Sequence, residues 1–317
     1  MRFTLLTFLL CSAVAVDAAI RLRAIDSKPR YGGPAEARQG SSASEGGHKS
    51  ADPTAPQFVQ STPNVFRRFA VDLAAMKTFY GDVLGLLPLG PINMPGGGQM
   101  TRFHVGAAEI KLQPSAAEAQ APKGGVKEVV GLRVLTFFFP DEAALTGRFT
   151  AHGMPAPEFR RASGATSSTA MVKDPSGQWV ELVVVPGAPP ATFEKLEVGL
   201  TVSDVEKSRT FYREFIGLEE LKPVADATLG VTKYPFRLGT MTINVWSFGT
   251  GLPANKSSAG IQYVVGNVEA IDARAKERAI QIDRPLGPFG TGLRTVWMSD
   301  PDGITNYFAQ LAPRQNR

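Results

Sequence analysis

The chain has 317 residues, of which 43% are hydrophobic and 20% charged, proportions ordinary for a globular protein. A net charge of +5 without any run of basic residues argues against nucleic acid as a partner. The single cysteine, Cys11, excludes an internal disulfide bond and a cysteine-based zinc site. The length suits two domains, each with its own hydrophobic core.

Residues 1–18 have the pattern of an export signal. Arg2 precedes an apolar stretch over residues 3–16, and small residues follow, with cleavage expected after Ala18. The apolar stretch is too short for a comfortable membrane span. We therefore expect a secreted or periplasmic protein that has no membrane contact once the signal peptide is removed.

Residues 19–62 are rich in glycine, serine, proline, alanine and charge, as in RQGSSASEGGHKSADPTAP. Such a composition cannot bury enough apolar surface to offset the entropy lost on ordering. We interpret this segment as a disordered linker.

Two segments of the remaining chain are repeated. Residues 70–86 (AVDLAAMKTFYGDVLGL) match residues 201–218 (TVSDVEKSRTFYREFIGL), and residues 172–185 (VKDPSGQWVELVVV) match residues 298–311 (MSDPDGITNYFAQL). The first pair has an Asp that suits a helix N-cap, followed by apolar residues spaced as on one helix face. The second pair contains Asp-Pro-x-Gly, a turn sequence in which Pro fixes φ and Gly admits a positive φ. A duplication therefore organises the chain.

Each repeat contains a second, fainter round of strand and helix. In the first repeat, the apolar run 131–139 leads into a helical pattern over 141–153. In the second repeat, the run 261–266 leads into a helical pattern over 268–280. Each repeat therefore reads as β-α-β-β-β twice, which gives four such units in the chain.

These features together resemble the vicinal oxygen chelate superfamily, which includes glyoxalase I, extradiol dioxygenases and bleomycin resistance proteins. The resemblance implies an α+β fold of tandem paired βαβββ units, the glyoxalase/bleomycin resistance fold, in which each pair forms a cup-shaped sheet. It gives two glyoxalase-like domains, residues 63–187 and 193–312. The alternative is a generic two-layer α+β protein with similar helices.

The resemblance also implies a divalent metal held by His, Gln or Glu at four places in each module. In the first module these places fall at Val65 (or Phe66 with a one-residue slip), Lys111, Arg133 and Glu181. Only the last of these carries a family-type ligand, so the set does not make a metal site.

In the second module the four places fall at Glu197, Asn244, Gly260 and Tyr307. A conventional three-ligand site is missing here too. We therefore predict no cofactor, while a divalent metal held by Glu181 and Glu197 is the fallback.

The first cup is expected to hold Lys111, Arg133 and Glu181, with Trp179 on the same face as Glu181. One interpretation is an internal salt-bridge network that stands where a metal would be. The other is a pocket in which Lys111 and Arg133 bind the anionic group of a ligand.

The second cup is expected to hold Glu197, Asn244, Trp246 and Tyr307. Glu197 and Tyr307 are the catalytic candidates, because a buried Glu with a raised pKa beside a phenol can perform acid–base chemistry. The alternative is a hydrogen-bonded polar pair that lines a small cavity.

Three functions follow from these cups. The first is an exported protein that binds a small molecule without the usual metal. The second is a metal-dependent lyase, isomerase or dioxygenase with nonstandard ligands. The third is a non-catalytic structural or interaction protein. The two modules can pair within one chain as a monomer, or the chain can form a homodimer.

Overall fold

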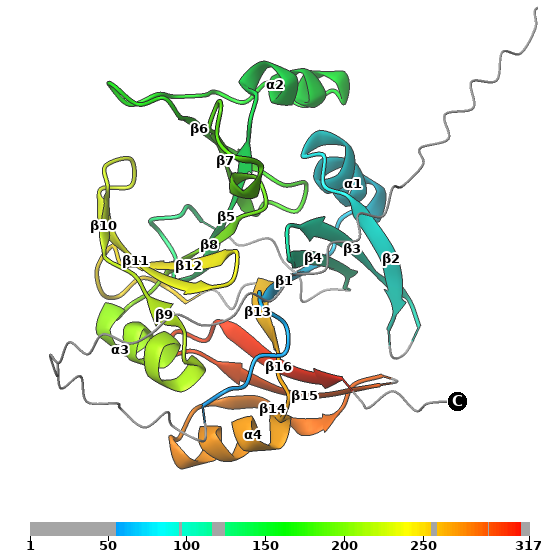
Figure 1. Ribbon diagram of the computed structural model, residues 1–317, viewed down its shortest axis with the longest axis vertical. Helices are drawn as coiled ribbons and strands as arrows, with labels where there is room; N and C mark the ends of the chain where they lie inside the picture. The colour runs from blue at the N-terminus through cyan, green and yellow to red at the C-terminus, as the bar shows by residue number, and fades with distance from the viewer. Residues whose placement is uncertain (1–54, 95–96, 116–123, 255–258, 291, 312–317) are drawn as a thin grey trace, which may run out of the picture. The chain divides into compact units, whose positions relative to one another are not determined.

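The computed structural model describes residues 55–94, 97–115, 124–254, 259–290 and 292–311 (Figure 1). The expected signal peptide, residues 1–18, and most of the expected linker lie outside the described residues. Within the described part of the chain, no helix is both long enough and apolar enough to cross a membrane.

The strands form two eight-stranded sheets, here called sheet I and sheet II. Sheet I has the order β14 (Ile282–Pro288), β15 (Leu293–Ser299), β16 (Thr305–Leu311), β13 (Ala259–Val264), β1 (Asn64–Phe69), β4 (Ala108–Pro114), β3 (Gln99–Val105), β2 (Pro88–Asn93). Sheet II has the order β10 (Val224–Asp226), β11 (Val231–Leu238), β12 (Met241–Trp246), β8 (Leu196–Thr201), β5 (Gly131–Phe139), β7 (Trp179–Val184), β6 (Ser168–Lys173), and β9 (Glu219–Glu220) also pairs with β11.

Each predicted helix begins at a polar capping residue. Over the described residues the α-helices are α1 (Leu73–Lys77), α2 (Glu142–Ala151), α3 (Val205–Thr210) and α4 (Val268–Glu277). Their first turns receive side-chain caps from Asp72, Asp141, Asp204 and Asn267, each of which accepts a hydrogen bond from a backbone N–H. Helices α1 and α3 continue as wider π-helical turns, η1 (Thr78–Val83) and η3 (Phe211–Ile216), which carry the repeated Phe-Tyr pairs. A short 3₁₀ turn, η2 (Pro190–Thr192), links the two repeats.

The fold is the predicted α+β arrangement of four units in which a strand and a helix are followed by further strands, but each sheet takes its units from both repeats. Three strands follow α1 and α4 as in the βαβββ pattern, whereas two strands, β6 and β7, follow α2 and four, β9 to β12, follow α3. Strands β1–β4 of the first repeat and β13–β16 of the second make sheet I, joined by the antiparallel pair β1–β13 (Figure 1). Strands β5–β7 of the first repeat and β8–β12 of the second make sheet II, joined by the antiparallel pair β5–β8. Each sheet therefore combines one half of each repeat.

This exchange corrects one expectation about the site. Lys111 lies in sheet I, whereas Glu181 lies in sheet II, so the two do not share a cup as the repeat boundaries suggested. Likewise, Glu197 lies in sheet II and Tyr307 in sheet I. The reason is that strand pairing is decided by contacts between repeats, which sequence similarity within the chain does not report.

The hydrophobic core takes side chains from both sheets, including Val65, Ile261, Leu182 and Val198, each of which is 0% exposed. Side chains alternate across each strand, so the residues between these core positions face the other side of the sheet. That other face carries the polar side chains of the candidate site.

The folded part begins before the expected domain boundary at Pro63. Phe58 forms an isolated bridge with Val265 and lies 5.9 Å from the ring of Tyr263. Thr62 is 1% exposed. Residues 57–59, assigned to the linker from composition, therefore pack against the end of β13, and Thr62 accepts a hydrogen bond from the backbone N–H of Thr240 between β11 and β12.

Candidate functional site

A cavity of about 660 Å³ opens on one face of sheet II. One wall comes from the segment 158–171, and the opposite wall from the hairpin between β10 and β11, which contributes Leu229. Its floor comes from side chains on the sheet itself, namely Thr136, Glu181, Lys233, Asn244 and Trp246. The volume suits a small organic molecule.

Four polar residues on adjacent strands form the centre of this face, and we call them the sheet II quartet. They are Thr136 on β5, Glu181 on β7, Glu197 on β8 and Asn244 on β12. Thr136 stands directly opposite both Glu181 and Glu197 in the strand register. Residues paired in this way point to the same face, which brings the two carboxylates to either side of the Thr136 hydroxyl.

Each carboxylate of the quartet has one hydrogen bond from a neighbouring strand. Thr136 Oγ1 donates to Glu181 Oε2 at 2.9 Å. Asn244 Nδ2 donates to Glu197 Oε2 at 2.7 Å. These bonds fix the orientation of both carboxylates while leaving the second oxygen of each without a hydrogen-bond partner among the described residues.

Burial raises the pKa of Glu197, and the nearby charge of Glu181 raises it further, whereas Asn244 and Lys233 act in the opposite direction. Burial opposes the charge of Lys233, but the pKa of this ammonium is raised because Asp226 and the two glutamates outweigh that effect. Lys233 Nζ lies 2.6 Å from Asp226 Oδ2. The floor of the cavity therefore combines Lys233 with Glu181, and Glu197 lies beside them on the same face of the sheet.

Trp246 closes the bottom of the cavity and is 2% exposed. Its ring covers Gly199 on the neighbouring strand so closely that a Cβ at Gly199 would collide with it. Its Nε1 donates to Thr201 Oγ1 at 2.9 Å. The ring is therefore held in one position, and a glycine at residue 199 is what allows it.

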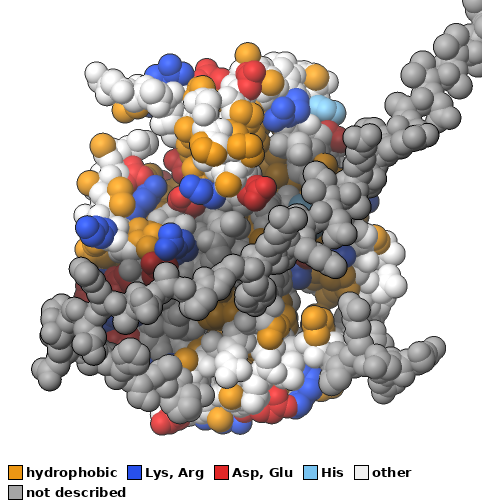
Figure 2. Space-filling view, in the orientation of Figure 1, with side chains coloured by type: hydrophobic (Ala, Val, Ile, Leu, Met, Phe, Trp, Pro, Cys, Tyr) orange, Lys and Arg blue, Asp and Glu red, His pale blue; other side chains and the backbone are white. Residues whose placement is uncertain are grey.

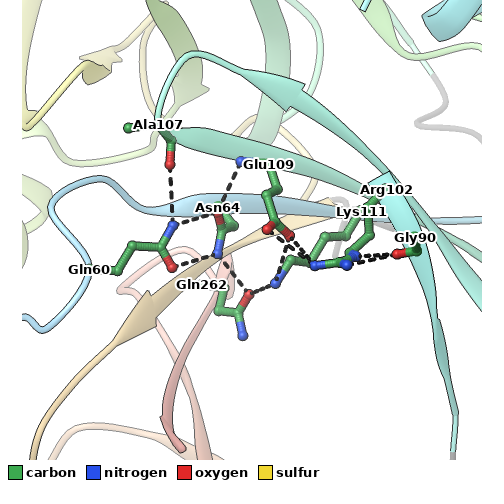
Figure 3. Close-up of polar contacts among 8 residues, drawn as sticks. All are labelled: Gln60, Asn64, Gly90, Arg102, Ala107, Glu109, Lys111 and Gln262. Atoms are coloured by element: carbon green, nitrogen blue, oxygen red, sulfur yellow. Dashed lines mark hydrogen bonds and ion pairs between the residues drawn. The ribbon is translucent and has the colours of Figure 1, made fainter. Parts of the chain in front are cut away.

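The corresponding face of sheet I is organised differently. The strand register places Asn64, Lys111, Gln262 and Tyr307 where sheet II has its quartet. Figure 3 shows the first three of these joined by hydrogen bonds. Lys111 Nζ donates to Gln262 Oε1 at 2.6 Å, and Asn64 Nδ2 donates to the same oxygen at 3.2 Å.

A salt-bridge network completes this group. Lys111 Nζ lies 3.4 Å from Glu109 Oε2, and Arg102 Nη1 lies 3.2 Å from Glu109 Oε1 (Figure 3). Lys111 is 8% exposed, and burial lowers its pKa even though Glu109 acts to raise it. The donors and acceptors of this network are directed at one another, and Lys111 pairs with Glu109 and Gln262 instead of the expected Glu181.

Aromatic side chains occupy the rest of this face of sheet I. The ring of Tyr307 stacks on Trp297 with centroids 4.7 Å apart and meets Phe66 edge-on at 5.2 Å. Burial raises the pKa of Tyr307 above its ordinary value. Tyr307 is thus a packed aromatic residue in sheet I, and the structure does not bring it next to Glu197.

Of the other residues expected in the first cup, Trp179 lies on the sheet II face, where Lys173 Nζ is 4.5 Å from its ring centroid. Arg133 lies at a register shift between Leu132 and Val134, and its Nη2 donates to the carbonyl oxygen of Gly124 at 2.7 Å. Arg133 does not line the cavity.

Sequence reasoning missed Asn64, Thr136 and Gln262, because its register was off by one to three residues. The expected place at Val65 faces the core, and the expected place at Gly260 lies beneath the ring of Phe66. Polar residues within otherwise apolar strands were a usable signal for all three. The sequence offered no comparable signal for Lys233, which lies on β11 of the β10–β11 hairpin.

The polar side chains were tested for the metal site that the family implies. Among the residues that the structure describes, no group of three or more His, Cys, Asp or Glu side chains is placed to hold a metal ion. The sheet II quartet supplies two carboxylates, and the Lys233 ammonium acts on both. The other two members of the quartet are a hydroxyl and an amide, and the set contains no imidazole, so it does not fit the usual three-ligand site.

The surface drawn in Figure 2 carries basic and acidic side chains intermixed over its described part. A surface of mixed sign does not concentrate the field that polyanions require.

Comparison with known proteins identifies the class. The family model described as Glyoxalase/Bleomycin resistance protein/Dioxygenase superfamily matches residues 62–182 and again residues 196–308. The chain belongs to this superfamily and contains two copies of its domain. No curated protein gave a significant match.

Solved structures agree on the fold. Glyoxalase I from Zea mays is 18% identical, with a TM-score of 0.59 over 81% of this chain and 92% of that chain. A putative dioxygenase from Bacillus subtilis is 15% identical, with a TM-score of 0.58 over 82% of this chain and 87% of that chain. At these identities the likeness establishes the fold, and function has to be argued from the site.

Proposed function

We propose that this chain is an exported protein that binds a small organic molecule in the cavity of sheet II. The observation that carries the proposal is the contrast between the two sheets. Thr136, Glu181 and Asn244 of the sheet II quartet line a cavity of about 660 Å³, and the quartet keeps unused hydrogen-bond acceptors. Of the matching residues in sheet I, Asn64, Lys111 and Gln262 bond to one another, and Tyr307 stacks on Trp297.

The cavity has the composition of a ligand site. Apolar groups such as Leu229 and Met171 line it together with a few convergent polar groups, a mixture typical of small-molecule pockets. A purely structural role for both repeats would not need this open volume in sheet II. Binding is therefore favoured over the structural alternative.

The export part of the proposal rests on the N-terminal sequence pattern alone. Expression of the full chain in a bacterial host, followed by fractionation and N-terminal sequencing, tests it. A mature protein that begins near Ala19 in the periplasm or medium supports export. An unprocessed chain in the cytoplasm contradicts it.

The second candidate is an enzyme of the lyase, isomerase or dioxygenase kind, and the raised pKa of Glu197 favours it. Metal analysis of the purified protein distinguishes metal-free binding from a metal-dependent enzyme. Binding without the usual metal predicts less than stoichiometric divalent metal after a chelator-free purification. One equivalent of tightly held metal would contradict the metal-free proposal.

Ligand binding itself is tested by a thermal-shift and ligand-observed NMR screen of small aromatic amines, acids and alcohols. Thr169→Trp, which places an indole inside the cavity, should abolish binding of any compound found. Thr150→Trp adds the same indole on the exposed side of α2 and should leave binding unchanged. Equal binding by both variants would place the ligand elsewhere.

A further inference from the structure

We infer that the ligand of the sheet II cavity carries a protonated amine, which Glu181 and Glu197 bind. This inference rests on the proposed function and specifies the chemical class of the ligand. In the sheet II quartet, a hydroxyl and an amide each donate a hydrogen bond to a carboxylate.

The two carboxylates are prepared to accept further hydrogen bonds. Thr136 holds one oxygen of Glu181, and Asn244 holds one oxygen of Glu197. The second oxygen of each has no hydrogen bond from the described residues. The two glutamates lie on either side of β5, so their Cα atoms are about 10 Å apart at ordinary strand spacing. A donor group placed above Thr136 is within reach of both carboxylates.

An ammonium group matches this arrangement. It has three N–H donors and no acceptor. It can therefore donate hydrogen bonds to the carboxylate oxygens and has no lone pair that would repel them. Charge-assisted bonds of this kind are the stronger class of hydrogen bond. A ligand carboxylate in the same place would face two groups of its own sign.

Lys233 does not neutralise the two glutamates. Its ammonium lies 2.6 Å from Asp226 Oδ2, and the charges of Glu181 and Glu197 act on it over a longer range. Lys195, which is exposed, also acts on Glu197. Three acidic groups against these two lysines leave a net negative charge, and a partly buried carboxylate without its own counter-charge favours an incoming cation.

The mouth of the cavity also carries charge, namely Glu158, Arg160 and Arg161. All three are exposed, where water and salt screen charges strongly. Arg161 is also within 3.9 Å of Glu142. The mouth therefore has less influence on the preferred charge of a ligand than the buried floor.

Three probes with one ring system test the inference by isothermal titration calorimetry at pH 7.5. Tryptamine carries an ammonium, tryptophol a hydroxyl and indole-3-propionate a carboxylate on the same two-carbon arm. We expect tryptamine to bind most tightly and indole-3-propionate most weakly, with about tenfold or more between them. Adding a chelator should leave the tryptamine affinity unchanged.

Glu181→Gln and Glu197→Gln test the contacts themselves. Each should weaken tryptamine by about tenfold while leaving tryptophol nearly unchanged, which also shows that the variant is folded and its cavity intact. Glu277→Gln, on the exposed face of α4, is the matched control and should bind all three probes as the parent does.

The outcomes separate the inference from the proposed function. Tighter binding of the carboxylate probe, or unchanged tryptamine affinity in both Gln variants, overturns the inference while the proposed function stands. A tryptamine affinity that needs a divalent metal overturns it as well. If none of the three probes binds, the inference fails, and the proposed function then depends on hits from the broader screen.

Discussion

Tyr80 Oη donates a hydrogen bond to Asp174 Oδ2 at 3.0 Å, and in the second repeat Tyr212 Oη donates to Asp300 Oδ2 at 3.1 Å. The tyrosines belong to the repeated Phe-Tyr helices, and the aspartates begin the repeated Asp-Pro-x-Gly turns. The two marks that reveal the duplication therefore form one buried contact in each repeat. This contact explains why they recur together.

The two aspartates differ in their charge partner. Arg67 Nη2 lies 2.8 Å from Asp174 Oδ2, with both side chains 0% exposed, and this pair links β1 of sheet I to the β6–β7 turn of sheet II. Asp300 has no salt bridge among the described residues. Two backbone N–H groups, of Asp302 and Ile304, donate to it, just as those of Ser176 and Gln178 donate to Asp174.

Arg67→Leu should lower the free energy of unfolding by about 3–5 kcal/mol, because it leaves the Asp174 carboxylate buried without its counter-charge. Urea denaturation followed by circular dichroism measures the change. Arg67→Leu combined with Asp174→Asn should recover part of the loss, since the double variant has no buried charge. A single variant within about 1 kcal/mol of the parent would contradict a role for this pair in stability.

Asp300 should make stability depend on pH. Burial raises the pKa of its carboxyl from 3.8 to about 7. Because the folded pKa lies above the ordinary value, the stabilisation is fully present below pH 3.8 and is lost as the pH rises through about 7. Asp300→Asn removes this titration, so the stability of the parent relative to the variant should fall by about 2 kcal/mol between pH 5 and 7. Parallel curves for the two proteins across that range would exclude it.

Gly199→Ala should destabilise the protein by about 1–3 kcal/mol, because the added Cβ meets the Trp246 ring and that ring has no room to move. Gly147→Ala is the matched control, since its Cβ would meet nothing within 4 Å in helix α2. The control should be neutral or more stable by up to about 1 kcal/mol. The melting temperatures of both variants, measured by thermal unfolding, test this prediction. Equal melting temperatures would show that the Trp246 ring can shift.

Asn244→Ala should raise the pKa of Glu197 further, because the hydrogen bond from Asn244 favours the charged carboxylate. The carboxyl ¹³C chemical shift of Glu197, followed through a pH titration, reports the change. Thr136→Val is a useful comparison, since it removes the donor to Glu181 instead. No difference between Asn244→Ala and the parent would mean that this bond does not form in solution.

The sequence predicts the local features of the fold better than it predicts the site. The helix caps at Asp72 and Asp204, the Phe-Tyr helices and the Asp-Pro-x-Gly turns are local features, decided by residues a few positions apart. The site depends on contacts between residues that are far apart in the chain. Glu181 was assigned to one cup and Asn244 and Trp246 to the other, whereas all three line one cavity of sheet II. Glu197 and Tyr307 were grouped although their strands belong to different sheets.

The sequence by itself determined that the chain has two repeats, each with two units that begin with a strand and a helix, because capping, turn chemistry and hydrophobic periodicity act within short segments. Only the tertiary structure decided which units share a sheet, because the pairs β1–β13 and β5–β8 join residues far apart in the chain. It also decided the register, which places Asn64 rather than Val65 on the cup face. Side chains alternate with a period of two along a strand, so a slip of one residue exchanges the core face for the site face.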